Sequence, residues 1–187
     1  MNPISPFLGC DRLYLRALVE ADADGPYPNW LNDEDVCRGN SHHMFPYTPE
    51  AARAYIRQAG QTRDSLVLAI ILRDGDRHIG NIALQHIHLV YRSAEFSIVI
   101  GDKAAWGNGY SKDAGRLICD HGFRALNLHR IECGTFEDNE AMKRLALHLG
   151  MKEEGRRRQA AYRGGCYVDV VEYGVLRREY EERWRER

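Results

Sequence analysis

Two glycines, Gly107 and Gly109, stand between a stretch with strand periodicity and a stretch with helix periodicity. Residues Ala94–Ile100 alternate as in a strand with one buried face, and small or apolar residues recur at helical spacing from Ala114 onward. Glycines let a ligand approach the backbone closely, and the free amides that begin a helix attract an anion. The pattern predicts an anion-binding loop. A plain strand-to-helix turn is the alternative that this segment alone leaves open.

Two histidines, His86 and His88, are spaced so that both side chains would lie on one face of a strand. Imidazole pairs of this kind can bind a metal, but no clear third ligand accompanies them. We therefore predict pocket-lining or partly buried histidines and no metal site. The five cysteines are scattered and never spaced as Cys-x-x-Cys, which favours small buried thiols in a reducing compartment over disulfides or zinc.

The remaining segments predict a set of strands and helices that would surround the loop. Strands are expected at 12–18, 66–72, 78–88, 94–100, 130–136, 152–162 and 166–176, and helices at 49–59, 111–126 and after Asn139, with a distorted helix at 20–32. The strands at 94–100 and 130–136 must be parallel, because a helix crosses over between them. Residues 40–49 are expected to form an irregular loop. The charged tail, 177–187, is expected to be a frayed, solvated helix, although it could also form an oligomer contact.

The chain has 187 residues, of which 44% are hydrophobic, and a formal net charge of -1. This length suits one well-buried core, so we expect a single domain over residues 1–187. The near-neutral charge gives no reason to expect nucleic acid or an anionic membrane as the main partner. The sequence lacks a basic leader followed by a long apolar run, so a cytoplasmic location is expected.

Five stretches of the chain together carry a resemblance to a known superfamily: AEFSIVIG, AWGNGYSKDAG, NLHRIECGTFEDNE, HLGMKEEG and YRGGCYVDVVEYGVL. Over Leu13–Leu176 the sequence resembles the GNAT superfamily of acyl-CoA-dependent N-acyltransferases. It is most similar to the branch that holds RimJ/RimL-type protein N-terminal, spermidine and nucleotide-aminosugar acetyltransferases. The resemblance implies an α+β fold: a mixed, mostly antiparallel sheet of six to seven strands with a central splayed parallel pair, flanked by helices.

The resemblance also implies acetyl-CoA as co-substrate and the residues that would bind it. Pantetheine would pair with the strand backbone around Ile98, Val99 and Ile100. The pyrophosphate would lie on the predicted anion loop, formed by Trp106, Gly107, Asn108, Gly109, Tyr110 and Ser111. Asn139 matches an asparagine that contacts the cofactor, although it is equally suited to cap a helix.

The sequence departs from the superfamily pattern mainly at the group that protonates the leaving thiolate. Ala146 and Met142 occupy the positions where relatives carry a tyrosine or a serine. Another group, such as Tyr91, Tyr162, Tyr167 or a water, would then supply the proton, or none is needed because a thiolate with a pKa near ~8.5 is a tolerable leaving group. The second explanation is favoured. A smaller departure is Ala104, where the loop often begins with Arg or Gln.

Glu95 is the candidate base that removes a proton from the amine, and His86 is the other candidate because its ordinary pKa lies nearer to neutrality. The alternative for Glu95 is a carboxylate at the rim, paired with an arginine such as Arg92. A strand amide, that of Val99, would polarise the thioester oxygen.

The acceptor is a primary amine whose identity the sequence leaves open. Aromatic and polar side chains that could surround it are Trp30, Phe45, Tyr47 and His88. An amine on an aminosugar, nucleotide-sugar or polyamine is favoured over a protein N-terminus, and the acidic run at 33–35 is a weak polyamine signal. A non-catalytic acyl-CoA sensor is the alternative of another class. A homodimer or larger homo-oligomer is compatible with the sequence.

Overall fold

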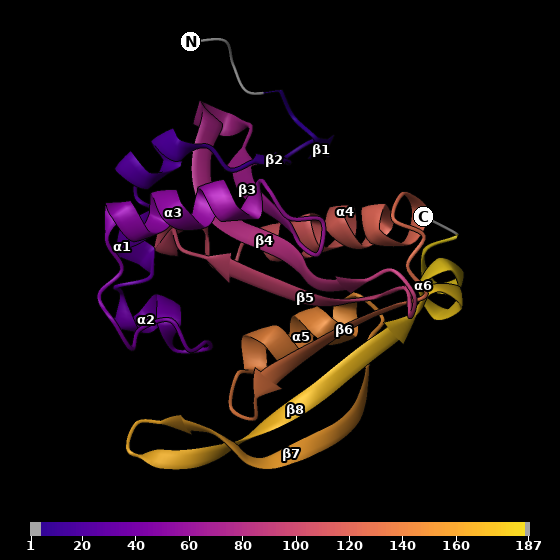
Figure 1. The fold of residues 1–187 in the computed structure, drawn as a ribbon. Helices are drawn as coiled ribbons and strands as arrows, with labels where there is room; N and C mark the ends of the chain where they lie inside the picture. The colour runs from indigo at the N-terminus through magenta and orange to yellow at the C-terminus, as the bar shows by residue number, and fades with distance from the viewer. Residues whose placement is uncertain (1–4, 186–187) are drawn as a thin grey trace.

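One sheet of eight strands forms the centre of the computed structural model, which describes residues 5–185 (Figure 1). The strands follow the order β1-β2-β3-β4-β5-β6-β8-β7. Their bounds are Leu8–Gly9 (β1), Leu13–Ala17 (β2), Leu66–Leu72 (β3), Arg77–His88 (β4), Ser93–Ile100 (β5), Arg130–Phe136 (β6), Lys152–Arg163 (β7) and Cys166–Leu176 (β8). Neighbouring strands are antiparallel except β5 and β6, which confirms the predicted mixed sheet with a central parallel pair.

The eighth strand, β1, was not expected because two residues are too few to produce a periodic pattern. Leu8 pairs with Leu15 and Gly9 with Tyr14, so β1 only extends the edge beside β2. The other seven strands were predicted within one or two residues of their ends. Some of them, such as β6, alternate between buried and less buried residues, whereas β3 is buried at five consecutive residues, Leu68–Leu72.

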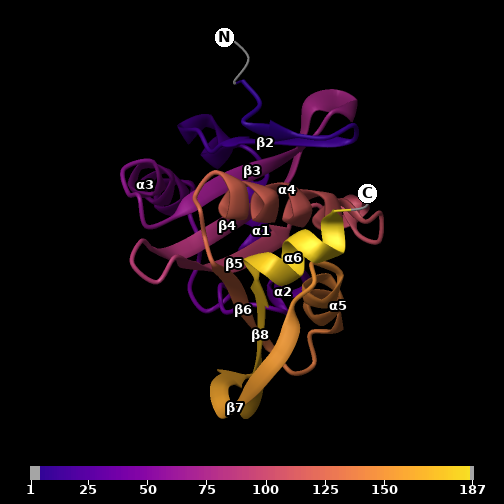
Figure 2. The same cartoon turned by 90° about the vertical axis from the view of Figure 1, so that its right-hand side faces the viewer.

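Helices flank the sheet, with α3 on one side and α4, α5 and α6 on the other (Figure 2). Their bounds are Tyr27–Trp30 (α1), Glu34–Cys37 (α2), Pro49–Ala59 (α3), Tyr110–Arg124 (α4), Glu140–His148 (α5) and Arg177–Trp184 (α6), with 3-10 helices at Glu20–Asp24, Asp74–Asp76 and Lys103–Ala105. The predicted distorted helix at 20–32 is therefore two short pieces. The Thr48 hydroxyl accepts a hydrogen bond from the amide of Ala51 at 3.2 Å, which confirms the predicted cap of α3.

The main core lies between the sheet and helices α4, α5 and α6. Phe96 of β5, Ile118 of α4 and Ile131 of β6 are each at most 2% exposed. A second, smaller core joins the short N-terminal helices to α3 and includes Trp30 and Ile56. Only the main core contains residues of β5 and β6, so the parallel pair is positioned by its packing against α4, α5 and α6.

The prediction of a frayed C-terminal helix is wrong for residues 177–184. Tyr180 and Trp184 of α6 are buried in the main core, and the Tyr180 hydroxyl donates to Asp120 of α4 at 3.0 Å. Charged residues dominate this segment, so its composition suggested a solvated helix. Two aromatic side chains four residues apart are enough to dock one turn of it.

Candidate functional site

Strands β5 and β6 pair only at their beginnings and then separate. The register joins Ser93 to Arg130, Ala94 to Ile131 and Glu95 to Glu132, and no later pair follows among the described residues. Beyond that point β5 stays paired with β4 as far as Ile100, and β6 stays paired with β8 as far as Phe136. The predicted splay is therefore present, and the facing edges of the two strands have no strand partner there.

A cavity of about 600 Å³ fills this opening. Its lining residues come from the loop before α4, from α5, from the α2 region and from both parted strands, with Glu95 among them. Of the predicted cofactor residues, the cavity is lined by Ile98, Val99, Ile100, Trp106, Gly107, Gly109, Tyr110, Ser111 and Asn139.

The free edge of β5 presents particular amides to the cavity. The Gly101 amide donates to the Ile79 carbonyl of β4 at 2.9 Å. Because successive amides of a strand point in opposite directions, the odd-numbered amides of β5 face β4 and the even-numbered amides face the opening. The Val99 carbonyl oxygen would lie 2.2 Å from a Cβ placed on Gly80 of β4, which agrees with this orientation. Val99 is therefore a poor candidate to polarise a thioester oxygen, and the Ile98 amide, which faces the opening, replaces it.

The loop before α4 has the geometry of an anion site. Gly107 and Gly109 adopt left-handed backbone conformations, with φ of +76° and +78°. Gly109 is also the N-cap of α4, and its carbonyl accepts from the Lys112 amide at 3.0 Å. The amides of Tyr110 and Ser111 precede the first helical hydrogen bond and are free for a ligand. Asn108 instead shapes the loop, because its Nδ2 donates to the Trp106 carbonyl at 3.1 Å.

Arg12, just before β2, forms hydrogen bonds that hold this loop in place, and it was not predicted as a site residue. Its Nη1 donates to the Asn108 carbonyl at 3.0 Å, and its Nε donates to Asp113 Oδ2 at 2.8 Å. The guanidinium also lies over the Tyr110 ring, 5.0 Å from its centroid. Arg12 is about a hundred residues away in sequence, so no local spacing indicates this contact.

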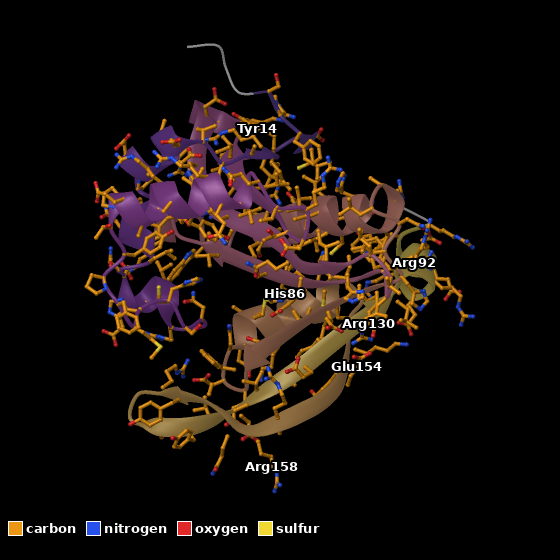
Figure 3. The ribbon with its side chains drawn as sticks, viewed as in Figure 1. Tyr14, His86, Arg92, Arg130, Glu154 and Arg158 are labelled. Carbon is orange, nitrogen blue, oxygen red and sulfur yellow. The ribbon has the colours of Figure 1, made fainter. Side chains whose placement is uncertain are left out.

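Glu95 lies where β5 and β6 part, and it lines the cavity. Its Oε2 lies 2.9 Å from His86 Nδ1. A carboxylate oxygen can only accept, so in this hydrogen bond Nδ1 carries the proton. His86 itself is not among the cavity-lining residues, and its side chain is 82% exposed (Figure 3). The structure thus pairs the two predicted base candidates. The partner of Glu95 is His86 and not Arg92.

The predicted alternation of His86 and His88 is broken by an irregularity of β4. The register with β5 shifts between Gln85 and His88, and His86 has a φ of +51°. This one-residue bulge aims the His86 ring at Glu95. The His88 ring stacks instead on Tyr91, with centroids 4.0 Å apart. The described residues contain no group of three or more His, Cys, Asp or Glu side chains suited to a metal.

The α2 region closes one side of the cavity through contacts that were not predicted. Lys103 bonds Asp33 at 2.9 Å and Asp35 at 2.8 Å, so both aspartates of the acidic run at 33–35 are already paired. Arg163 of β7 donates to the Arg38 carbonyl and to the Asp138 carboxylate. These contacts tie three distant segments together across the opening.

Asn139 takes part in the same closure. Its Oδ1 accepts from the Met142 amide at 3.1 Å and caps α5, while its Nδ2 donates to the Gly39 carbonyl at 3.3 Å. The helix-cap interpretation is therefore confirmed. A direct contact with a cofactor remains a prediction.

Asn139→Ala should lower the free energy of unfolding by about 1 kcal/mol, because the cap of α5 is lost. Urea unfolding of the purified protein measures this change. Asn139→Asp keeps the capping oxygen and replaces the amide donor with a carboxylate, whose negative charge is favourable at a helix N-terminus, so its stability should stay near that of the parent. An alanine variant as stable as the parent would contradict the capping role.

None of the four predicted acceptor residues is among the cavity-lining side chains. Trp30 is 7% exposed and packs against His78, with ring centroids 4.9 Å apart. Phe45 is 81% exposed, and the Tyr47 hydroxyl lies 3.2 Å from that of Tyr27. His88 stacks on Tyr91, as described above. Their contact with an acceptor therefore stays a prediction.

The three tyrosines considered as proton donors do not line the cavity, and the two α5 positions where relatives carry a donor are apolar. Met142 lines the cavity and Ala146 is fully buried beside it on α5. Tyr91, Tyr162 and Tyr167 are all exposed and are not among the lining residues. None of the described helices is long and apolar enough to cross a bilayer.

Comparison with known proteins gives a consistent picture. Residues 12–152 match the family model of the acetyltransferase (GNAT) domain. The uncharacterised N-acetyltransferase YoaA of Bacillus subtilis is 31% identical over 175 residues, which cover 92% of this chain and 97% of the relative. The spermidine N(1)-acetyltransferase of Vibrio cholerae is 29% identical over 121 residues, 64% of this chain and 69% of the relative.

A solved structure has the same fold. The crystal structure of spermidine N-acetyltransferase from Vibrio cholerae in complex with CoA and spermine superposes with a TM-score of 0.82. The sequences are 24% identical, and the match covers 91% of this chain and 99% of that one.

Proposed function

The chain belongs to the GNAT acetyltransferase family, and we propose that it transfers an acetyl group directly from acetyl-CoA to a primary amine of a small molecule such as an aminosugar, a nucleotide-sugar or a polyamine. The observation that carries this proposal is the cavity between the parted strands β5 and β6, which joins the glycine loop at one end to Glu95 at the other. Acetyl-CoA is an acyl thioester and supplies an activated acyl group. The chain's own residues must supply binding, orientation and proton removal.

The described residues fit this co-substrate. The Ile98 amide on the free edge of β5 suits the amide-bearing pantetheine arm, as an added strand would. The amides of Tyr110 and Ser111, with the dipole of α4, suit a pyrophosphate. Gly107 leaves open space where a side chain would otherwise stand, since no atom lies within 4 Å of an added Cβ.

The cysteines give no support for an acylated intermediate on the protein. Cys133 lies on β6 near the opening, but burial raises the pKa of its thiol to about 12. Such a thiol stays protonated at neutral pH and is a weak nucleophile. Direct transfer within a complex of both substrates is therefore the mechanism that these residues favour.

In this mechanism Glu95 removes a proton from the ammonium form of the acceptor, because the free amine is the nucleophile. His86 is a positioning residue that holds the Glu95 carboxylate through Nδ1. The Ile98 amide polarises the thioester oxygen. The amine lone pair forms the C–N bond, the C–S bond breaks with its electron pair going to sulfur, and the nitrogen loses its second proton to water.

The acceptor class is supported by the family and by the position of Glu95. Glu95 lies on the face of β5 opposite Phe96, which packs toward α4, so the acceptor would arrive from the face opposite the anion loop. The spermidine acetyltransferase named above shows that a relative in this family acts on a small polyamine. A small amine in this chain is the corresponding proposal.

Two measurements on the purified protein test the proposal. Calorimetry should show acetyl-CoA binding, and release of free thiol should then be followed with polyamines, aminosugars, nucleotide-aminosugars and short peptides. Thiol release with one small-amine class is the expected result. Release only with peptides would move the acceptor to protein N-termini, and tight binding with no release would favour an acyl-CoA sensor.

A further inference from the structure

Thr135 of β6 has a buried hydroxyl that no described residue satisfies. The residue is 5% exposed, and its Oγ1 has no hydrogen-bond partner within residues 5–185. Thr135 is also one of the residues that line the cavity. Buried hydroxyls in proteins are normally paired, and valine would fill the same space without this cost.

The register places Thr135 near the end of the cavity that contains Glu95, which we call the acyl end. The opposite end, at the glycine loop, is the anion end. Glu95 pairs with Glu132, and both strands continue from there without pairing to each other. Three residues further along each strand, Ile98 and Thr135 stand on opposite sides of the opening. Ile98 is the residue whose amide we assign to the thioester oxygen, so Thr135 lies across the opening from that group.

Other hydroxyls that line the cavity are occupied or lie elsewhere. Ser97 donates to Gln85 Oε1 at 3.2 Å. Tyr110 and Ser111 belong to the first turn of α4, at the anion end. Helix α5 contributes Glu140, Ala141, Met142 and Leu145 to the lining, and none of these side chains carries a hydroxyl. Among the described residues, Thr135 is therefore the lining hydroxyl still available to a ligand at the acyl end.

We propose that the Thr135 hydroxyl donates a hydrogen bond to the sulfur of the acyl donor as the C–S bond breaks, an inference that rests on the proposed function. The electron pair of that bond passes to sulfur, and the resulting thiolate accepts the hydrogen bond while Thr135 keeps its proton. The thiolate later takes a proton from water. An alcohol hydroxyl is a far weaker acid than a thiol, so it stabilises the anion without protonating it.

This arrangement accounts for the apolar residues at 142 and 146. A donor that only hydrogen-bonds to the thiolate makes a proton donor on α5 unnecessary, because a thiol with a pKa near ~8.5 leaves readily as an anion. The same hydrogen bond should favour the thiolate of bound CoA. CoA affinity should then increase as the pH rises through the range in which the bound thiol ionises.

The test compares the parent protein with Thr135→Val and Thr135→Ser in calorimetric binding and thermal unfolding. The ligands are CoA and a CoA analogue in which hydrogen replaces the thiol, each at pH 7 and pH 9. For Thr135→Val we expect CoA affinity at pH 9 to fall about tenfold or more, since hydrogen bonds to charged groups are strong. Affinity for the analogue should be unchanged, and Thr135→Ser should restore CoA affinity.

Thermal unfolding without ligand gives an independent readout. Thr135→Val should raise the midpoint by a few degrees, because an unpaired buried hydroxyl is removed, while the added stabilisation by CoA becomes smaller. Equal weakening of CoA and the analogue would overturn the assignment to sulfur, and unchanged CoA affinity at both pH values would overturn any ligand role. Failure of the parent protein to bind CoA would instead reject the proposed function itself.

Discussion

Glu95→Gln should lower kcat about a hundredfold or more, with no change in the Kd for acetyl-CoA. Glutamine has nearly the same shape and can still hydrogen-bond to His86, but it cannot take a proton from the ammonium group of the acceptor. The base acts on the acceptor and lies at the end of the cavity away from the anion loop. Steady-state kinetics with an identified acceptor and calorimetry with acetyl-CoA measure the two quantities.

Glu132→Gln provides a matched control for this substitution. Glu132 is the β6 residue that pairs with Glu95, its side chain is similarly exposed, and the substitution removes the same charge. It is held by Arg130, whose Nε donates to it at 2.6 Å, and it is not among the lining residues; Figure 3 shows Arg130 beside Glu154. Glu132→Gln should keep kcat within a few fold of the parent.

A variant of His86 separates the two base candidates. His86→Asn keeps a donor for the Glu95 carboxylate and removes the titratable ring, so most activity should remain. If His86→Asn lost activity as severely as expected for Glu95→Gln, while Glu95→Gln remained active, the base would be His86. That result would also require the ring to reach the acceptor from its exposed position on β4.

The sequence predicted most of the sheet because its strands carry strong local patterns. Segments such as 66–72 and 130–136 are short, apolar or alternating, and bounded by turn residues, and the structure has the strands at these positions. The parallel direction of β6 followed from the crossover helix alone. Among the elements that were missed, β1 and α2 span only two and four residues, and both contact other segments: β1 pairs with β2, and Asp35 of α2 bonds Lys103.

The site was predictable where it is local in sequence. The glycine loop and the cap of α5 are each contained within a few consecutive residues, so spacing and residue type indicate them, whereas the free strand edge was expected only from the resemblance to the GNAT superfamily. Arg12 and Arg163 reach the site from segments far away in sequence, and only the folded chain brings them there. The predicted acceptor residues followed from composition alone, and composition does not specify which aromatic side chain faces a cavity.

Thr135 and Val99 illustrate a further limit. Their positions on the strands were predicted correctly, but the function of each depends on which way one hydroxyl or one amide points. The direction of the Val99 amide depends on which residues of β5 form hydrogen bonds with β4. The availability of the Thr135 hydroxyl depends on whether any neighbouring group pairs with it. Neither can be read from residue types.

Gly107→Ala should weaken acetyl-CoA binding about 10- to 100-fold, the loss expected when one or two hydrogen bonds to a charged group are disturbed. Gly107 has a φ of +76°, so alanine is strained there, and its methyl group would stand where a ligand approaches the loop. Calorimetry measures the affinity, and thermal unfolding without ligand measures the strain.

Gly75→Ala distinguishes strain from lost contact with the ligand. Gly75 lies in the β3–β4 turn with a φ of +72°, and at both glycines no atom lies within 4 Å of an added Cβ. The two variants should therefore lose similar stability, about 1 kcal/mol each. Only Gly107→Ala should lose affinity. Equal affinities in the two variants would mean that the loop is a structural turn, and the anion site would then have to be sought elsewhere along the cavity.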